Sequence, residues 1–387
     1  MRGGSSIAGE LFNCDPAATM WYEPGDAFFS SYYGLHHENL PQNDLYFRNM
    51  TRRKLNRDEL EANVDFYNNI FSCNYERLPP EVMAHSFLGQ STAMDGYVKC
   101  RRKVTRTKHL DIITCKRHIS HTCSRKMVET SLNSNCHIVI RALNTITKSN
   151  PSVRNERSLL KLVQKHLHEN GFNIPIGDEN NLLQFVKHGH CIEIMRSDNF
   201  KCLHLAKKKC QTDNLLVVQV NRMKMEDLEP VIKTNPDMRV IHYTRDPRAI
   251  AFSRSRTGIL IFDKINRSSV REAEFVCHKM REDLKQRLIL EKKYPDVFTH
   301  LTYESLATDP ERFARRIYEM LNKTYPEEWK PFVAKHMYGK SEGSMFGITV
   351  KNATRTAFRW RSKIPKYQLD MINGFCGDVI TGLGYQL

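Results

Sequence analysis

The chain has 387 residues, of which 40% are hydrophobic, and a formal net charge of +16 at pH 7. This length supports a sizeable core and excludes a disulfide-stabilised miniprotein. No apolar run approaches the roughly 20 residues of a membrane helix, and no secretory signal pattern opens the chain. The basic excess predicts an anionic partner, such as nucleic acid, acidic lipid, an acidic glycan or a phosphorylated cofactor.

The sequence opens with MRGGSSIAGELF, a glycine-rich turn followed by a helical pattern. The pattern predicts a helix over 6–13, with Gly3 and Gly4 as the turn before it. Phosphate-binding loops join a buried strand to a helix N-terminus, where free N–H groups and the helix dipole meet the anion. No strand precedes this turn, so it is either an ordinary chain start or the chain begins one strand late. A short strand is expected next, over 17–24.

The region from 98 to about 198 is polar, irregular and strongly basic at its start. We interpret it as an insertion or lid-like subregion at about 85–200, with a helix at 156–168. Its segment CKRHISHTC (115–123) lacks the paired spacing of a zinc finger, so disulfides or a solvated basic face are the preferred interpretations.

Cysteines and glycosylation sequons indicate a secretory compartment. Eleven cysteines are many for a cytosolic enzyme, and the odd number leaves at least one thiol unpaired or paired to another chain. N-x-S/T sequons begin at Asn49, Asn266, Asn322 and Asn352. Each sequon alone is a weak signal, because such triplets arise often by chance.

The second half of the chain alternates predicted strands and helices. Apolar runs predict strands at 214–220, 238–247 and 297–306, the first of them buried, and helices are expected at 225–235, 268–293 and 308–321. Thr308 or Asp309 is the expected cap of the last helix, with Pro310 in its first turn. This alternation predicts an α/β fold with a mostly parallel sheet. Trp360 is expected to pack in the core.

The stretch YTRDPRAIAFSRSR (243–256) is the strongest candidate site. Arg245 ends a predicted strand and Ser253 lies two helical turns later, so both can reach one anion at the carboxyl end of the sheet. The other reading is a solvated, salt-bridged helix start in which Asp246 pairs with Arg248. The residues alone favour neither reading.

Seven motifs together resemble the Golgi carbohydrate sulfotransferases: RGGSS, GELFN, YEP, RDPRAIAFSR, LTYESLATDPERFARRIYEML, AFRWR and the closing LGYQL. The resemblance covers about 1–34 and 210–387 and is strongest to the galactose, N-acetylglucosamine and N-acetylgalactosamine 6-O branch. It implies one sulfotransferase domain over 1–387, a P-loop-like α/β fold with a central, mostly parallel sheet flanked by helices. It also implies that the first strand is missing and the chain is N-terminally incomplete.

In that family the first motif binds the 5′-phosphosulfate of the donor PAPS, the second binds its 3′-phosphate, and the glutamate of the E-P pair is the general base. Carried over, the catalytic residues are Glu23 and Arg2. The donor-binding residues are Arg2, Gly3, Gly4, Ser5, Ser6, Ile7, Arg245, Arg248 and Ser253. No metal is expected. This chain departs from the family at Gly3, where serine is usual, and in its longer interval between Arg2 and Arg245.

The resemblance implies a PAPS-dependent enzyme that transfers a sulfuryl group to a hydroxyl, expected to be 6-O, of galactose or an N-acetylhexosamine. The acceptor is a glycan or glycosaminoglycan, and nucleic acid is not expected as a partner. The complete protein is expected in the Golgi lumen as a type II membrane glycoprotein with an upstream anchor, and a homodimer is one expected form. Two alternatives stay open: a non-catalytic protein of the same fold that binds polyanions or glycans, and a P-loop kinase.

Overall fold

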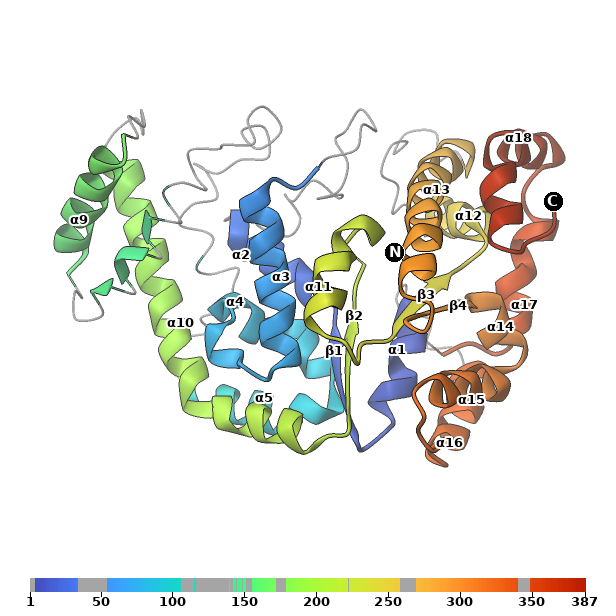
Figure 1. Cartoon of the computed structure of the whole chain (residues 1–387), viewed down its shortest axis with the longest axis horizontal. Coiled ribbons are helices and arrows are strands. Elements are labelled where there is room, and N and C mark those ends of the chain that lie inside the picture. Colours follow the sequence, from blue (N-terminus) through green and yellow to red (C-terminus); the bar gives the residue numbers. More distant parts are fainter. Residues whose placement is uncertain are drawn as a thin grey trace. The chain divides into compact units, whose positions relative to one another are not determined.

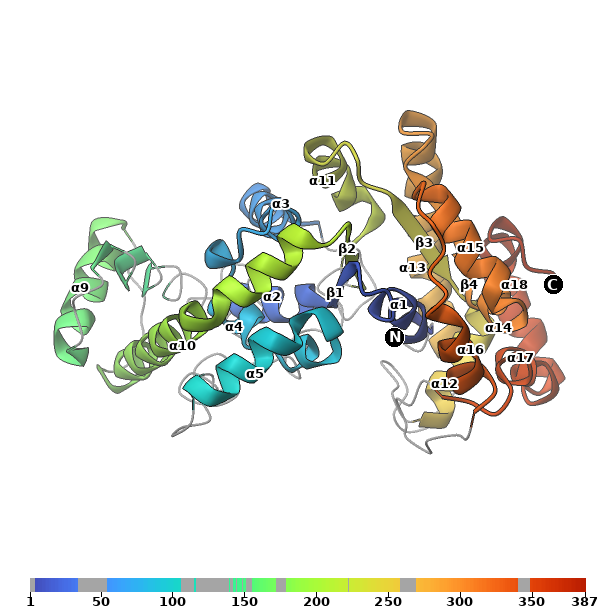
Figure 2. The same cartoon turned by 90° about the horizontal axis from the view of Figure 1, so that it is seen from below.

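The computed structural model describes residues 4–33, 54–105, 155–171, 179–221, 223–257, 269–339 and 349–387, with short pieces between 115 and 150. The chain forms two compact units (Figures 1 and 2). The terminal unit comprises Met1–Ala18 and Met223–Leu387, and the middle unit comprises Thr19–Arg222. The single domain with an insertion at about 85–200 stays a prediction.

The terminal unit contains a parallel pair of strands, β3 (Val240–Thr244) and β4 (Phe298–Thr302). Their register runs from Val240 opposite Phe298 to Thr244 opposite Thr302. Parallel strands need a crossover connection, which the intervening helices supply. The predicted α/β class with parallel strands is therefore confirmed for this part of the chain.

The second sheet joins β1 (Ala18–Tyr22) to β2 (Leu215–Gln219). All five residues of β1 are buried, whereas all five residues of β2 are half-buried. The prediction that the apolar run at 214–220 is a fully buried strand is therefore wrong. In the described part of the chain β2 pairs with one neighbour only, so one of its edges is not covered by another strand.

Helices account for most of the residues that the structure describes in both units. Those of the terminal unit are α1 (Ser5–Asn13), η4 (Met225–Leu228), α11 (Glu229–Thr234), α12 (Pro247–Thr257), α13 (Ser269–Lys293), α14 (Tyr303–Thr308), α15 (Pro310–Met320), α16 (Trp329–Met337), α17 (Ala353–Phe358), η5 (Arg359–Ser362) and α18 (Lys366–Gly382). Those of the middle unit are α2 (Pro24–Tyr33), α3 (Arg57–Phe71), η1 (Tyr75–Arg77), α4 (Pro80–Met83), η2 (Ser86–Gln90), η3 (Thr92–Met94), α5 (Asp95–Val104), α9 (Glu156–Glu169) and α10 (Glu179–Thr212). None of the described helices is long and apolar enough to cross a membrane.

Local sequence signals place several of these helices correctly. The predicted helices at 6–13, 156–168 and 268–293 correspond to α1, α9 and α13. Asp309 caps α15, because its carboxylate accepts a hydrogen bond from the N–H of Arg312 at 3.0 Å and Pro310 occupies the first turn. The predicted core position of Trp360 is also confirmed, since its side chain is buried against Ala249 and Ile364.

Two predictions of secondary structure are wrong. The strand expected over 297–306 ends at Thr302, where a capping box with Ser305 starts α14 instead. The region up to about 198 is not irregular throughout, because α10 runs through Glu179–Thr212. Disulfides hold that helix to distant segments through the pairs Cys73–Cys210, Cys100–Cys202 and Cys115–Cys191. Such long-range bonds stabilise a helix whose own sequence pattern is weak.

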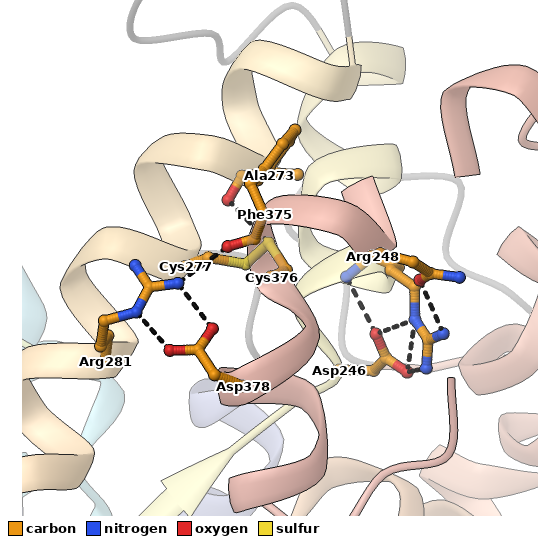
Figure 3. Close-up of a disulfide and its surroundings, with 9 residues drawn as sticks. Asp246, Arg248, Ala273, Cys277, Arg281, Phe375, Cys376 and Asp378 are labelled. Carbon is orange, nitrogen blue, oxygen red and sulfur yellow. Dashed lines mark hydrogen bonds and ion pairs between the residues drawn. A yellow bond between two sulfur atoms is a disulfide. The ribbon is translucent and has the colours of Figure 1, made fainter. Parts of the chain in front are cut away.

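A fourth disulfide lies in the terminal unit, where Cys277 on α13 is bonded to Cys376 on α18 (Figure 3). Beside it, Arg281 binds the carboxylate of Asp378 and the carbonyl of Phe375. The helices α12, α13 and α18 pack together here around an apolar core (Figure 1). Among the described residues Cys14 is the free thiol, which fits the odd cysteine number. Burial raises the pKa of this thiol to about 11.

One face of the β3–β4 pair carries two histidines at matching register. His242 lies opposite His300, with ring centroids 5.6 Å apart, and His300 Nε2 is 2.8 Å from the hydroxyl of Thr244. Burial lowers the pKa of His242 to about 3, with smaller contributions from His300 and the Arg287 cation. Burial likewise lowers the pKa of His300 to about 4. Both rings are therefore neutral near pH 7.

Candidate active site

The carboxyl ends of β3 and β4 bring Arg245 and Tyr303 together. Each residue directly follows its strand, and the last paired residues are Thr244 and Thr302, so the two side chains lie at the same edge of the sheet. The guanidinium carbon of Arg245 is 4.3 Å from the centroid of the Tyr303 ring, a cation–π contact. Arg245 is 9% exposed, so its charge is held close to the protein interior.

The start of α1 packs against the same tyrosine ring. Gly4 precedes the helix with φ of 80°, in the left-handed region that glycine adopts without strain. A Cβ at this position would lie 2.2 Å from Cδ2 of Tyr303, so only a residue without a side chain fits here. The Tyr303 ring therefore joins two sequence motifs, the glycine turn at the start of α1 and the arginine after β3.

The first turn of α1 presents backbone donors at this place. The N–H groups of the first turn of a helix have no partner within the helix, and the helix dipole makes that end positive. Ser5 is half-buried and Ser6 is exposed, whereas the side chain of Ile7 is buried in the core. Arg2 and Gly3, which complete the predicted loop, lie outside the described residues. The N-terminus of α1 and the Arg245 guanidinium, both next to Tyr303, are groups of the kind that bind anions.

Arg248 is committed to contacts within the protein. Its guanidinium binds both oxygens of Asp246 (Figure 3). It also donates to the side-chain carbonyl of Asn373 at 3.2 Å and to the backbone carbonyl of Gln386 at 2.6 Å. It also lies 4.5 Å from the ring centroid of Trp360. The pairing of Asp246 with Arg248 that the alternative reading predicts is present, but the pair is buried, so the solvated helix start of that reading is wrong. The predicted contact of Arg248 with a donor stays a prediction.

A buried carboxylate fixes the same loop from its other side. Glu304 accepts hydrogen bonds from the N–H of Asp246 at 3.2 Å and from the hydroxyl of Tyr385 at 2.8 Å. Burial raises the pKa of Glu304. Together with the bond from Arg248 to the Gln386 carbonyl, this contact ties the C-terminal residues to the loop that carries Arg245.

Ser253 lies on α12 and is half-buried. The next residue, Arg254, forms a buried ion pair with Glu272 of α13, with 3.3 Å between nitrogen and oxygen. Burial lowers the pKa of Arg254. This pair attaches α12 to α13 and so holds the helix that presents Ser253.

Glu23 belongs to the middle unit, and its surroundings are described there by themselves. It follows β1 directly, while Asn221 lies just beyond the end of β2. The side-chain amide of Asn221 donates to Oε1 of Glu23 at 2.6 Å, and that of Gln219 donates to the same oxygen at 3.4 Å. The carboxyl ends of β1 and β2 therefore meet at this carboxylate.

The backbone of Glu23 is unusual. Its φ of 43° places a residue other than glycine in the left-handed region, a strained conformation that is frequent at functional sites. Pro24, which follows it, begins α2. The backbone conformation of Glu23 and the start of α2 fix the direction of the side chain, and two amide donors bind its carboxylate.

Three of these residues in the terminal unit, Tyr303, Glu304 and Tyr385, and one in the middle unit, Asn221, have no role in the sequence prediction. The first three fall inside motifs that carry the family resemblance, LTYESL and LGYQL, and that position was their only signal. Nothing in the local sequence marks Asn221, which is 198 residues from its partner Glu23. Among the described residues no cluster of histidine, cysteine, aspartate or glutamate could hold a metal ion.

Known proteins match parts of this chain. Carbohydrate sulfotransferase 2 of Mus musculus is 25% identical over 217 residues, covering 46% of this chain and 41% of the relative. Carbohydrate sulfotransferase 1 of Rattus norvegicus is 24% identical over 224 residues, covering 52% of each chain. The matches thus span about half of the curated relatives or less. A solved structure, the sulfotransferase domain from the curacin biosynthetic pathway, has 18% identity and a TM-score of 0.37 over 58% of this chain and 78% of its own.

The profile of the sulfotransferase family matches residues 113–327. This range is more than half of the chain and includes β2, β3, β4 and the helices between them. It also includes Arg245, Tyr303 and Glu304, which lie together at the carboxyl ends of β3 and β4. The chain belongs to the sulfotransferase family.

Proposed function

We propose that this chain transfers a sulfuryl group from PAPS to a carbohydrate hydroxyl, namely the 6-O position of galactose or an N-acetylhexosamine. The observation that carries the proposal is the shared contact of Gly4 and Arg245 with the Tyr303 ring at the carboxyl ends of parallel strands. Ligands of open α/β sheets bind at that edge. The names of the relatives, carbohydrate sulfotransferases, support a sugar acceptor.

We assign the donor as follows. The N–H groups at the start of α1, with Arg2, bind the 5′-phosphosulfate, and Arg245 with Ser253 binds the 3′-phosphate. A permanently charged guanidinium and a helix N-terminus are both suited to phosphate oxygens. Arg248 holds the loop in shape through its bonds to Asp246 and the Gln386 carbonyl.

In the reaction, the acceptor oxygen forms a bond to sulfur while the bond from sulfur to the phosphate oxygen breaks. The electron pair of the broken bond stays on that phosphate oxygen, whose negative charge the α1 N-terminus stabilises. We assign Glu23 as the base that takes the hydroxyl proton. Asn221 and Gln219 then act as positioning residues, because their amides fix one oxygen of this carboxylate.

The disulfides support a secretory location, since such bonds form in oxidising compartments. The Golgi lumen as location and a glycan or glycosaminoglycan as acceptor are proposed from the resemblance to carbohydrate sulfotransferases. The upstream membrane anchor and the homodimer stay predictions.

The test measures transfer of labelled sulfate from PAPS to acceptors that bear galactose or N-acetylhexosamine. We expect Glu23→Gln to lower turnover by about 10²–10⁴-fold, because it removes the base and keeps the shape. Asn221→Ala loses a hydrogen bond to a charged group, worth about 1.5–3 kcal/mol, so turnover falls about tenfold or more. Glu61→Gln is the matched control, since Glu61 is an exposed glutamate of the same unit, paired with Arg57 on α3. Near-normal turnover of Glu23→Gln removes Glu23 from the role of base.

Donor binding is tested separately by calorimetry with 3′,5′-diphosphoadenosine. Arg245→Ala is expected to weaken binding about tenfold or more, since a charge-assisted contact is worth about 1.5–3 kcal/mol. Unchanged affinity in a folded variant removes Arg245 from the donor site. Heparin binding without any sulfate transfer supports the polyanion-binding alternative, and preference for ATP over diphosphoadenosine supports the kinase.

A further inference from the structure

The turn after α15 carries the sequence Asn322-Lys323-Thr324, an acceptor triplet for N-linked glycosylation. The helix ends at Met320, and the side chains of Asn322 and Thr324 are both exposed. The residue between them is not proline, which the triplet does not tolerate. Exposure of both side chains means that a glycan here projects into solvent without displacing any packed group.

The backbone of this turn is well defined. Asn322 has φ of 51°, its N–H donates to the Glu319 carbonyl at 3.0 Å, and the N–H of Lys323 donates to the Tyr318 carbonyl at 2.9 Å. These two bonds close the C-terminus of α15 with a left-handed residue, a common way for helices to end. Tyr325 anchors the far side of the turn, because its ring packs edge-on against Tyr318 at 6.1 Å. The chain thus presents the asparagine from a fixed position.

The same turn has a purely structural explanation. Asparagine is favoured in left-handed helix caps, so Asn322 could serve the backbone alone. That explanation gives no reason for a hydroxyl two residues later, and the Thr324 side chain is exposed. The two explanations differ in what Thr324 does, which makes them separable by mutation.

The other described sequon is different. The side-chain oxygen of Asn352 caps α17 by accepting from the N–H of Arg355 at 2.7 Å, and the Thr354 hydroxyl donates to the Ala307 carbonyl at 2.8 Å. Both polar side chains of that triplet have structural roles. The sequons at Asn49 and Asn266 lie outside the described residues.

The compartment fits the modification. Three disulfides tie α10 to distant segments and a fourth joins α13 to α18, so the protein folds where thiols are oxidised. In eukaryotic cells the same secretory route is where N-x-S/T triplets meet the glycosylation machinery. This observation is independent of the triplet itself.

We propose that Asn322 carries an N-linked glycan. The donor is an oligosaccharide joined through a diphosphate to a lipid. The side-chain amide nitrogen forms a bond to the first sugar carbon, the bond from that carbon to the diphosphate oxygen breaks, and the amide loses one proton. The lipid diphosphate keeps the electron pair of the broken bond. The modification belongs to the exposed turn after α15 and is independent of the sulfotransferase reaction.

The experiment expresses the full chain behind a secretion signal in eukaryotic cells and determines the mass of the peptide that contains residue 322, before and after treatment with an N-glycosidase. We expect a glycan on that peptide in the wild type and in Thr324→Ser, which keeps the triplet. Thr324→Val and Asn322→Gly are expected to lose it. Asn322→Gly is also the folding control, because glycine is suited to the left-handed cap and stability is expected to be kept.

The proposal is overturned if the peptide is unmodified in secreted protein whose disulfides are intact, or if Thr324→Val has the same glycan as the wild type. An unmodified peptide together with stability loss in Thr324→Val assigns the turn to structure alone.

Discussion

Replacement of Gly4 by alanine is the sharpest test of the site, because the structure gives two separate reasons why this residue must be glycine. Its φ of 80° is left-handed, and an added Cβ would lie 2.2 Å and 2.6 Å from two carbons of the Tyr303 ring. The ring is held in turn by its contact with the Arg245 guanidinium. Gly4→Ala is therefore expected to displace both the first turn of α1 and the Arg245 side chain.

The size of the effect follows from these two terms. A residue with a Cβ in the left-handed region costs about 1–2 kcal/mol. Insertion of a methyl group into a packed contact costs about 1–3 kcal/mol more. We therefore expect Gly4→Ala to lower the free energy of unfolding by about 2–5 kcal/mol. If only 1.4 kcal/mol of this cost is lost from the binding of the sulfate donor, its affinity falls about tenfold.

The assays are urea unfolding and calorimetric titration with 3′,5′-diphosphoadenosine. Gly96→Ala is the matched control, since Gly96 lies inside α5 with no atom within 4 Å of an added Cβ, and alanine there is expected to be neutral or stabilising by about 0.5–1 kcal/mol. In the double variant Gly4→Ala/Tyr303→Ala the steric clash is gone, whereas the cost of the left-handed φ at residue 4 stays. The double variant should therefore lose less stability than the sum of the losses of the two single variants. Gly4→Ala with unchanged stability and donor affinity refutes this account of the site.

Three further predictions concern the support of the site. Tyr385→Phe removes the hydroxyl that donates to the buried carboxylate of Glu304. We expect the free energy of unfolding, measured in urea, to fall by about 1–3 kcal/mol and the sulfate donor to bind more weakly. Unchanged stability and affinity contradict a supporting role of the C-terminal residues. Replacing Cys277 and Cys376 by serine removes a bond between residues 99 positions apart and is expected to lower the free energy of unfolding by about 2–5 kcal/mol, measured by thermal unfolding against oxidised wild type. In the folded protein His242 stays neutral down to about pH 3, whereas in the unfolded chain the same side chain is protonated below about pH 6.5. The unfolded state therefore binds the extra proton in this window, and the free energy of unfolding falls as the pH falls, by up to about 1.4 kcal/mol per pH unit. His242→Gln should flatten this slope in unfolding titrations at about pH 7 and about pH 5.

The sequence alone determined the elements whose signals are local. The helix after Gly4, the long helix α13 and the capped start of α15 all depend on residues within a few positions of one another. The same holds for the end of β3, because its apolar run stops at Thr244 and polar residues follow. The sequence therefore placed Arg245 at a strand end, which the structure confirms.

Two helices were beyond the predictions from hydrophobic periodicity. The helix α10 has weak amphipathic character of its own and owes its support to disulfides with segments 76 to 137 residues away. The run YESL continues an apolar strand in sequence, but the capping box of Thr302 and Ser305 turns it into a helix. In both cases an interaction other than hydrophobic periodicity decided the structure.

For the candidate site, the sequence determined which residue types carry the chemistry: a glycine turn, an arginine after a strand and a glutamate before a proline. Only the tertiary structure decided how they are held. Tyr303 contacts Gly4, which lies 299 positions earlier in the sequence, the Arg248 guanidinium donates to the Gln386 carbonyl, and Glu23 is oriented by Asn221. Such pairs form when separate segments fold against one another, and no local pattern encodes them because neither partner affects the short-range conformation of the other.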